Sequence, residues 1–149
     1  MTMENALRRL LIVSAITALA ACGQPAAPDI KVTDAWARAT APGQGGAVYA
    51  TIDNKGGTGD RLLSVSTDRA SMAMIHEGGM ENGVARMRMV NSLDVGPGEQ
   101  AKLAPGGNHI MLEGLKASLA AGDKFQLTMR FERSGNIAVP VSVVAPGSR

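Results

Sequence analysis

Cysteine, aromatic residues and excess charge are all scarce in this sequence. It has one cysteine among 149 residues, which excludes an internal disulfide and the Cys-x-x-Cys motif of thiol oxidoreductases. Aromatic residues make up 3% of the chain, and its net charge is +2. Basic runs with interleaved aromatic residues do not occur, so the composition excludes a nucleic-acid-binding protein.

A hydrophobic run long enough to span a bilayer is also missing. Residues 10–21 are apolar or small throughout, but they number 12, whereas a transmembrane helix needs about 20 apolar residues. Arg8 and Arg9 precede this run, and positive charge followed by a short apolar run is typical of a signal peptide. We therefore predict a signal peptide over residues 1–21 and export to the periplasm.

The stretch Leu19-Ala20-Ala21-Cys22 resembles a lipobox, in which the cysteine is lipidated and becomes the first residue of the mature protein. We predict that Cys22 carries the lipid anchor and that residues 22–29 form a linker between the membrane and the domain. The alternative is ordinary signal cleavage nearby, with Cys22 incidental. Gly23 follows in place of the aspartate that signals inner-membrane retention in some bacteria, and the sequence leaves open which membrane holds the anchor.

Beyond the linker, short runs of β-forming residues alternate with turns rich in Gly, Asn, Asp and Pro. The predicted strands cover residues 30–39, 47–54, 62–67, 71–77, 84–90, 100–103, 108–113, 124–132 and 136–144. The pairs Gly78-Gly79 and Asn82-Gly83 are hairpin signals, and residues 115–121 allow at most one helical turn. Eight or nine strands predict an all-β domain over residues 30–144, an antiparallel sandwich or Greek-key barrel, with a short tail at 145–149.

Methionine is abundant, and its position relative to the two histidines indicates a metal-binding site. Seven of the nine methionines lie between residues 72 and 129, as do both histidines. Four of these residues have the spacing His76-x10-Met87-x21-His109-x-Met111. Neutral imidazole and thioether donors favour Cu(I) over Zn(II) or Ca(II). A blue-copper electron-transfer centre needs a thiolate, which residues 30–144 lack. We therefore predict one copper-binding site with these four ligands.

Strand alternation separates these candidates from the core. His109 and Met111 share one face of their strand, and Ile110 and Leu112 take the opposite face, where we expect the core. The hairpin after the first histidine should bring Met87 beside it.

Other large residues have simpler expected roles. Methionine usually fills gaps in a core, and three methionines are expected to do so: Met72, Met74 and Met129. Trp36 is expected to point inward. The roles of Met80 and Met89 stay open, although Met89 shares a face with Met87 and is a possible outer or alternative ligand.

The spacing of the four predicted ligands resembles the signature of the PCuAC-type periplasmic copper chaperones. The resemblance covers about residues 30–144, and the flanking segments that share it are residues 35–40, 46–49, 105–112 and 121–123. It implies a cupredoxin-like sandwich that carries Cu(I) toward the binuclear copper centre of cytochrome c oxidase. Met89 stands where the family has proline. The chain ends without a His/Met-rich tail, so we expect one copper per domain.

The sequence therefore favours a copper carrier over an enzyme, because it offers no nucleophile with a base and an orienting partner. One alternative is a metal-free structural or adhesive β-sandwich lipoprotein. Another is an oxidoreductase, either a thiol reductase, which the missing Cys-x-x-Cys disfavours, or a copper oxidase, which would need a redox-cycling site. The copper-accepting partner, and the choice between oxidase assembly and copper tolerance, stay open.

Overall fold

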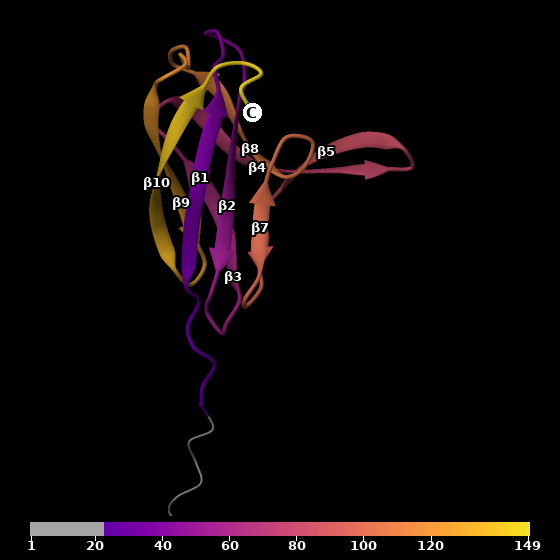
Figure 1. The fold of residues 1–149 in the computed structure, drawn as a ribbon, viewed down its shortest axis with the longest axis vertical. Coiled ribbons are helices and arrows are strands. Elements are labelled where there is room, and N and C mark those ends of the chain that lie inside the picture. The colour runs from indigo at the N-terminus through magenta and orange to yellow at the C-terminus, as the bar shows by residue number, and fades with distance from the viewer. Residues whose placement is uncertain (1–22) are drawn as a thin grey trace, which may run out of the picture.

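The computed structural model of the protein describes residues 23–149, and all of its regular elements are strands (Figure 1). The predicted signal peptide and Cys22 lie outside the described residues. The strands are β1 (Ile30–Arg38), β2 (Gly46–Asn54), β3 (Asp60–Ser66), β4 (Ala70–Glu81), β5 (Val84–Val90), β6 (Leu93–Val95), β7 (Gln100–Leu103), β8 (His109–Leu115), β9 (Lys124–Phe131) and β10 (Gly135–Val144). The all-β prediction is confirmed.

The strands form one sheet in the order β5-β4-β8-β2-β1-β10-β9-β3-β6, and β7 pairs with the second half of β2. Neighbouring strands are antiparallel except β1 and β10, which are parallel, so the sheet is mixed rather than purely antiparallel. Buried apolar side chains from every strand except β5 join one core cluster. The fold is thus a cupredoxin-like β-sandwich with the core between its layers.

The terminal hairpin shows how alternation fixes the register. Every second residue of β9, from Phe125 to Phe131, is buried, and Val139, Val141 and Val143 of β10 are buried in the same way. Pro140 faces β9, while pairing of β10 with β1 begins only at Ser142. Pro140 therefore lies in the part of β10 that pairs with β9 alone, and proline fits there because it has no N–H to donate to a second strand.

Two details of the predicted strands are wrong. A tenth strand, the three-residue β6, was not expected, because a run this short carries no measurable alternation. Gly78 and Gly79 lie inside β4 and do not form a turn. The turn is formed by Asn82 and Gly83, whose φ angles of 52° and 78° suit a two-residue hairpin. Residues 115–121 contain no helical turn.

The hairpin of β4 and β5 extends away from the body of the sandwich (Figure 1). Residues 79–89, which form its outer part, are all exposed, and only Val90 of β5 packs against the core. β5 is also the first strand of the sheet order, so among residues 23–149 one of its edges has no strand beside it. In the described part of the chain, no helix is long and apolar enough to cross a membrane.

Candidate metal centre

The two histidines face each other across neighbouring strands. His76 of β4 is directly paired with His109 of β8, and their ring centroids are 5.3 Å apart with the rings edge to face. The pair lies on the face of the sheet opposite Ile75 and Ile110, which are both core residues. His109 is nevertheless buried, with 6% of its surface exposed, and His76 is half-buried. A single site for both imidazoles is therefore geometrically possible.

The predicted methionine ligands lie on either side of this pair. Met111, two residues after the histidine of β8, is paired with Met74. Met87 of β5 is paired with Gly78, two residues after the histidine of β4. Paired residues and alternate residues of a strand point to one face. All four predicted ligands therefore share one face of the strands β5-β4-β8.

Met89, named from the sequence as a possible outer or alternative ligand, is nearer to His76 in the strand register than Met87 is. It is paired directly with His76, whereas Met87 is one alternation step further out. Both side chains lie on the outer strand and are largely exposed, Met87 by 62% and Met89 by 61%. Four methionines thus flank the histidine pair on the same face: Met87, Met89, Met111 and its partner Met74.

A tight turn holds the His109 ring. The segment from Ala104 to Asn108 closes with backbone hydrogen bonds, and Gly106 has a φ of 80° that favours glycine. This places the carbonyl of Gly107 3.0 Å from Nδ1 of His109. A carbonyl only accepts, so this contact is a hydrogen bond in the tautomer that carries its proton on Nδ1, and that tautomer leaves the Nε2 lone pair for a metal. Such a bond orients many metal-binding histidines.

Gly78 allows this turn to pack against β4. A Cβ atom at Gly78 would lie 2.5 Å from the carbonyl oxygen of Gly107, closer than real Cβ atoms come. A Cβ at Gly45 would lie 2.5 Å from Cε of Met111, but this atom is the end of a flexible side chain that can move away. The packing role of Gly78 was not predicted from the sequence, where it was interpreted as a hairpin signal, although Pro105-Gly106-Gly107 is a turn signal.

Aromatic residues extend the histidine row across the sheet. The Tyr49 ring lies 6.4 Å from that of His109 and 4.5 Å from that of Trp36. The guanidinium carbons of Arg38 and Arg149 lie 5.9 Å and 5.7 Å from the Trp36 ring centroid. This layer explains why His109 is buried although it lies on the face opposite the core.

The expected inward orientation of Trp36 is wrong. Trp36 is buried, but it belongs to the aromatic layer and not to the core cluster. The pairing of β1 with β2 shifts between Thr33 and Trp36, and Asp34 has a φ of 53°. The extra residue reverses the alternation, so Ala37 points into the core and Trp36 points to the opposite face.

The expected roles of the remaining methionines hold only in part. Met129 is fully buried in the core, as predicted. Met72 is 54% exposed, and Met74 lies on the histidine face opposite Met111, so neither fills a gap in the core. Met80 at the outer end of β4 is 71% exposed. These three side chains share the face of β4 that carries His76, because all four positions have the same parity.

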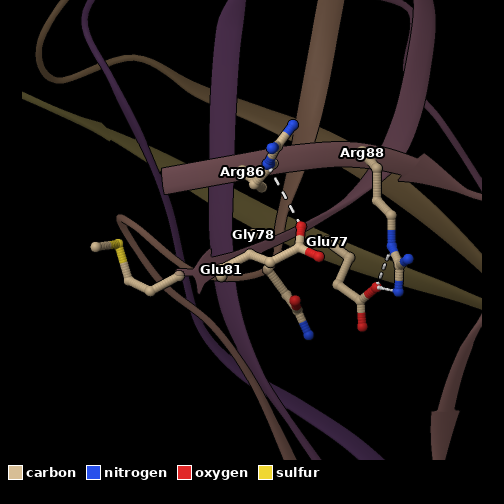
Figure 2. A pocket seen from close by; sticks show the side chains of 8 residues that line it. Glu77, Gly78, Glu81, Arg86 and Arg88 are labelled. Carbon is tan, nitrogen blue, oxygen red and sulfur yellow. Dashed lines mark hydrogen bonds and ion pairs between the residues drawn. The ribbon is translucent and has the colours of Figure 1, made fainter. Parts of the chain in front are cut away.

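The other face of the hairpin is ionic. A surface pocket at the hairpin includes the pairs Arg88 with Glu77 and Arg86 with Glu81 (Figure 2). Oε2 of Glu77 lies 2.5 Å from Nη2 and 2.7 Å from Nε of Arg88, and Oε2 of Glu81 lies 3.4 Å from Nε of Arg86. The carboxylates of this pocket are already paired with arginines, so they do not form a second metal site.

The described residues contain no cluster of three or more His, Cys, Asp and Glu that could hold a metal ion. A metal at the histidine pair would therefore need sulfur from methionine as additional ligands. Imidazole with thioether is a neutral, soft donor set, which suits Cu(I) and disfavours ions that need anionic oxygen.

Sequence comparisons match most of the chain to one family and to two relatives. Residues 30–143 match the model of the family "Putative lipoprotein LpqE-like". The chain is 36% identical over 118 residues to "Putative lipoprotein Lxx21020" of Leifsonia xyli subsp. xyli, covering 77% of this chain and 70% of the relative. It is 32% identical over 124 residues to "Uncharacterized protein RP573" of Rickettsia prowazekii, covering 80% and 68%.

Similar solved structures are PCuAC domains and a copper(I)-loaded protein. The apo PCuAC domain from PmoF1 has 28% identity and a TM-score of 0.68, with 83% of this chain and 100% of that chain covered. CuI-DR1885 from Deinococcus radiodurans has 26% identity and a TM-score of 0.61, with 83% of each chain covered. The copper-bound PCuAC domain from PmoF2, at 23% identity, 83% and 99% coverage and a TM-score of 0.68, shows likeness of fold alone.

Proposed function

The chain belongs to the LpqE-like lipoprotein family, and from that premise we propose that it is a periplasmic copper chaperone which binds one Cu(I). The proposed ligands are His76, Met87, His109 and Met111. The observation that carries the proposal is the hydrogen bonding and position of the His109 ring. Its Nδ1 donates to a backbone carbonyl, and its Nε2 lies free beside a second imidazole on a face rich in methionine.

The exposure of the methionines supports a carrier. A metal that must be handed on has to be reached by an acceptor, and Met87 lies on an exposed hairpin. Thioethers are neutral, so an incoming thiolate replaces a weaker donor without expelling an anion. A buried His109 on the rigid sheet and an exposed sulfur on the hairpin give the site a fixed side and an exchangeable side.

The fold likeness to PCuAC domains supports copper as the cargo. The proposed acceptor is a copper-requiring protein, and the resemblance of the ligand spacing points to the binuclear copper centre of cytochrome c oxidase. The competing function, a metal-free structural or adhesive lipoprotein, offers no reason for a histidine pair flanked by exposed methionines. No enzymatic role is proposed.

Replacing a sulfur ligand tests the copper site. Met111→Leu keeps the size and apolarity of the side chain but removes the thioether, so the free energy of unfolding should change by less than about 1.5 kcal/mol. Cu(I) affinity, measured by competition with a chelator on the purified full-length protein, should fall at least about 10-fold. Met72→Leu is the matched control, because Met72 is an exposed methionine on the same face. Equal affinities of wild type and both variants would remove the chemical basis of the proposal.

Replacing the cysteine tests the proposed anchor. Cys22→Ser should release the protein from the membrane fraction or leave the precursor unprocessed, because serine has no thiol to accept the lipid. Cu(I) affinity should not change. Fractionation and intact mass measure the first effect, and unchanged membrane association with unchanged mass would exclude lipidation at this residue.

A further inference from the structure

We propose that Met89 is a further thioether ligand of the copper site and that it exchanges with Met87 on the projecting hairpin. This inference rests on the proposed function and extends its ligand set. In the exchange, one copper–sulfur bond forms as the other breaks. Both donors are neutral, so neither a proton nor an electron is transferred.

The strand register favours Met89 as the sulfur next to His76. Side chains that are directly paired across antiparallel strands have Cβ atoms about 4.5–5.5 Å apart, whereas diagonal neighbours are about 7–8 Å apart. Met89 is the direct partner of His76, and Met87 is a diagonal neighbour. His109 is the direct partner of His76 on the other side. Met89, His76 and His109 thus form one row across three strands.

The turn before β8 lies on the Met87 side of this row. Met87 is paired with Gly78, and the backbone of Gly107 packs against Gly78 so closely that a Cβ there would meet its oxygen at 2.5 Å. The Gly107 backbone therefore lies over Gly78, which is the residue between Met87 and the turn before β8. The direct position of Met89 opposite His76 does not involve that contact.

The composition of β5 leaves its sulfur face free for a soft metal. Alternation puts Ala85, Met87 and Met89 on one face and the two arginines of β5 on the other, where they pair with glutamates of β4 (Figure 2). No ionic side chain of β5 therefore competes with the thioethers. The exposed fractions of Met87 and Met89 are nearly equal, so core packing does not account for either.

Both sulfurs are carried by one exposed hairpin, while His109 and Met111 belong to the body of the sandwich. Met87 and Met89 are alternate residues, about 7 Å apart along the strand. Their long, flexible side chains can therefore bring one sulfur or the other to the histidine pair without a change of strand register. Exchange keeps the copper bound while one of its outer positions opens to an acceptor.

Single and double leucine variants test this inference. Met87→Leu and Met89→Leu should each lower Cu(I) affinity only slightly, because the remaining sulfur takes over. The double variant should lower it at least about 10-fold, far more than the two single effects combined. X-ray absorption of the Cu(I)-loaded full-length protein should show the same number of sulfur ligands in wild type and both single variants, and one fewer in the double variant. Met80→Leu, an exposed methionine of the same hairpin, is the control and should leave the affinity unchanged.

The outcomes separate this inference from the proposed function. If Met87→Leu alone binds Cu(I) as weakly as the double variant does, Met89 is not a ligand. Copper binding by the wild type would still support the proposed chaperone function. If Met89→Leu alone binds Cu(I) as weakly as the double variant does, Met87 does not replace Met89 and the two sulfurs do not exchange. A wild-type protein that binds no Cu(I) overturns the proposed function and this inference together. Unfolding in urea should be alike for all variants, because the substituted side chains are exposed.

Discussion

The polar side chains at the two ends of β2 differ in how fully they are hydrogen-bonded. Where β2 ends, the buried Asn54 uses its whole amide: it accepts from the N–H groups of Asp29 and Gly56 at 3.1 and 3.0 Å and donates to the carbonyls of Thr58 and Val95 at 2.9 and 3.2 Å. Near the start of β2, where Ala47 pairs with Met111, the histidine pair has a free ring nitrogen and exposed sulfurs.

Fully hydrogen-bonded groups stabilise the fold, whereas groups with unused lone pairs are available to bind a metal. A buried polar group costs free energy unless all of its hydrogen-bonding capacity is used, so a fully bonded Asn54 is a structural element. A free imidazole nitrogen next to exposed thioethers contributes little to stability. Substitutions at the Asn54 end should therefore change stability without changing Cu(I) affinity. Substitutions at the histidine face should lower Cu(I) affinity with a smaller change in stability.

The largest expected effect comes from Asn54→Ala. It leaves two N–H groups and two carbonyls without their partner, and the free energy of unfolding should fall by about 2–4 kcal/mol. Asp53→Ala is the control, because its carboxylate accepts one exposed hydrogen bond, from Gln100, and should cost less than about 1 kcal/mol. Urea denaturation measures both. Cu(I) affinity of the folded Asn54→Ala protein should equal that of the wild type, and a lower affinity would break the separation between the two ends.

Asp60→Asn should have a smaller effect that depends on pH. The buried Asp60 accepts from the N–H groups of Arg61, Arg133 and Ser134 at 2.8, 2.9 and 2.9 Å, which ties the β9–β10 turn to β3. Burial raises the pKa of Asp60, but hydrogen bonds from Ser134, Arg133 and Arg61 outweigh it and hold the pKa below its usual value of 3.8. At neutral pH the variant should lose about 1–2 kcal/mol of unfolding free energy.

The sign of the pH dependence follows from that lowered pKa. The unfolded carboxyl binds a proton more readily than the folded one, so the contribution of Asp60 is complete above the unfolded value of 3.8. It is lost as the pH falls through the lower folded pKa. The stability of Asp60→Asn should therefore decrease less steeply in acid than that of the wild type. Parallel curves of unfolding free energy against pH would contradict this role.

The smallest expected change in stability, and a clear loss of copper binding, should come from Gly78→Ala. The new Cβ would displace the Gly107 carbonyl that holds Nδ1 of His109, so Cu(I) affinity should fall about 10-fold. The free energy of unfolding should fall by about 1 kcal/mol. Gly79→Ala is a closely matched control, because nothing lies within 4 Å of its added Cβ. Equal Cu(I) affinities for the two variants would show that the Gly107 contact does not position the ring.

Strand alternation was the most reliable guide from sequence to structure. The buried residues of β9 and β10 and the core positions of Ile110 and Leu112 follow from a period of two, which needs only local residue order. The same rule failed at Trp36, because a bulge in β1 adds one residue and inverts all later positions of that strand. The turn signal at Gly78-Gly79 was wrong for another reason: glycine indicates conformational freedom, but not whether a turn or a close contact uses it.

The sequence by itself determined the donor chemistry of this protein: two imidazoles, several thioethers and no thiol in the domain, at spacings that place them on neighbouring strands. The tertiary structure decided which donors are neighbours, because pairing register is a long-range property that local order does not contain. It paired His76 with His109 and with Met89, buried His109 beneath Tyr49, and turned the Gly107 carbonyl onto its ring. Types of ligand follow from residue identity, whereas their arrangement follows only from the folded sheet.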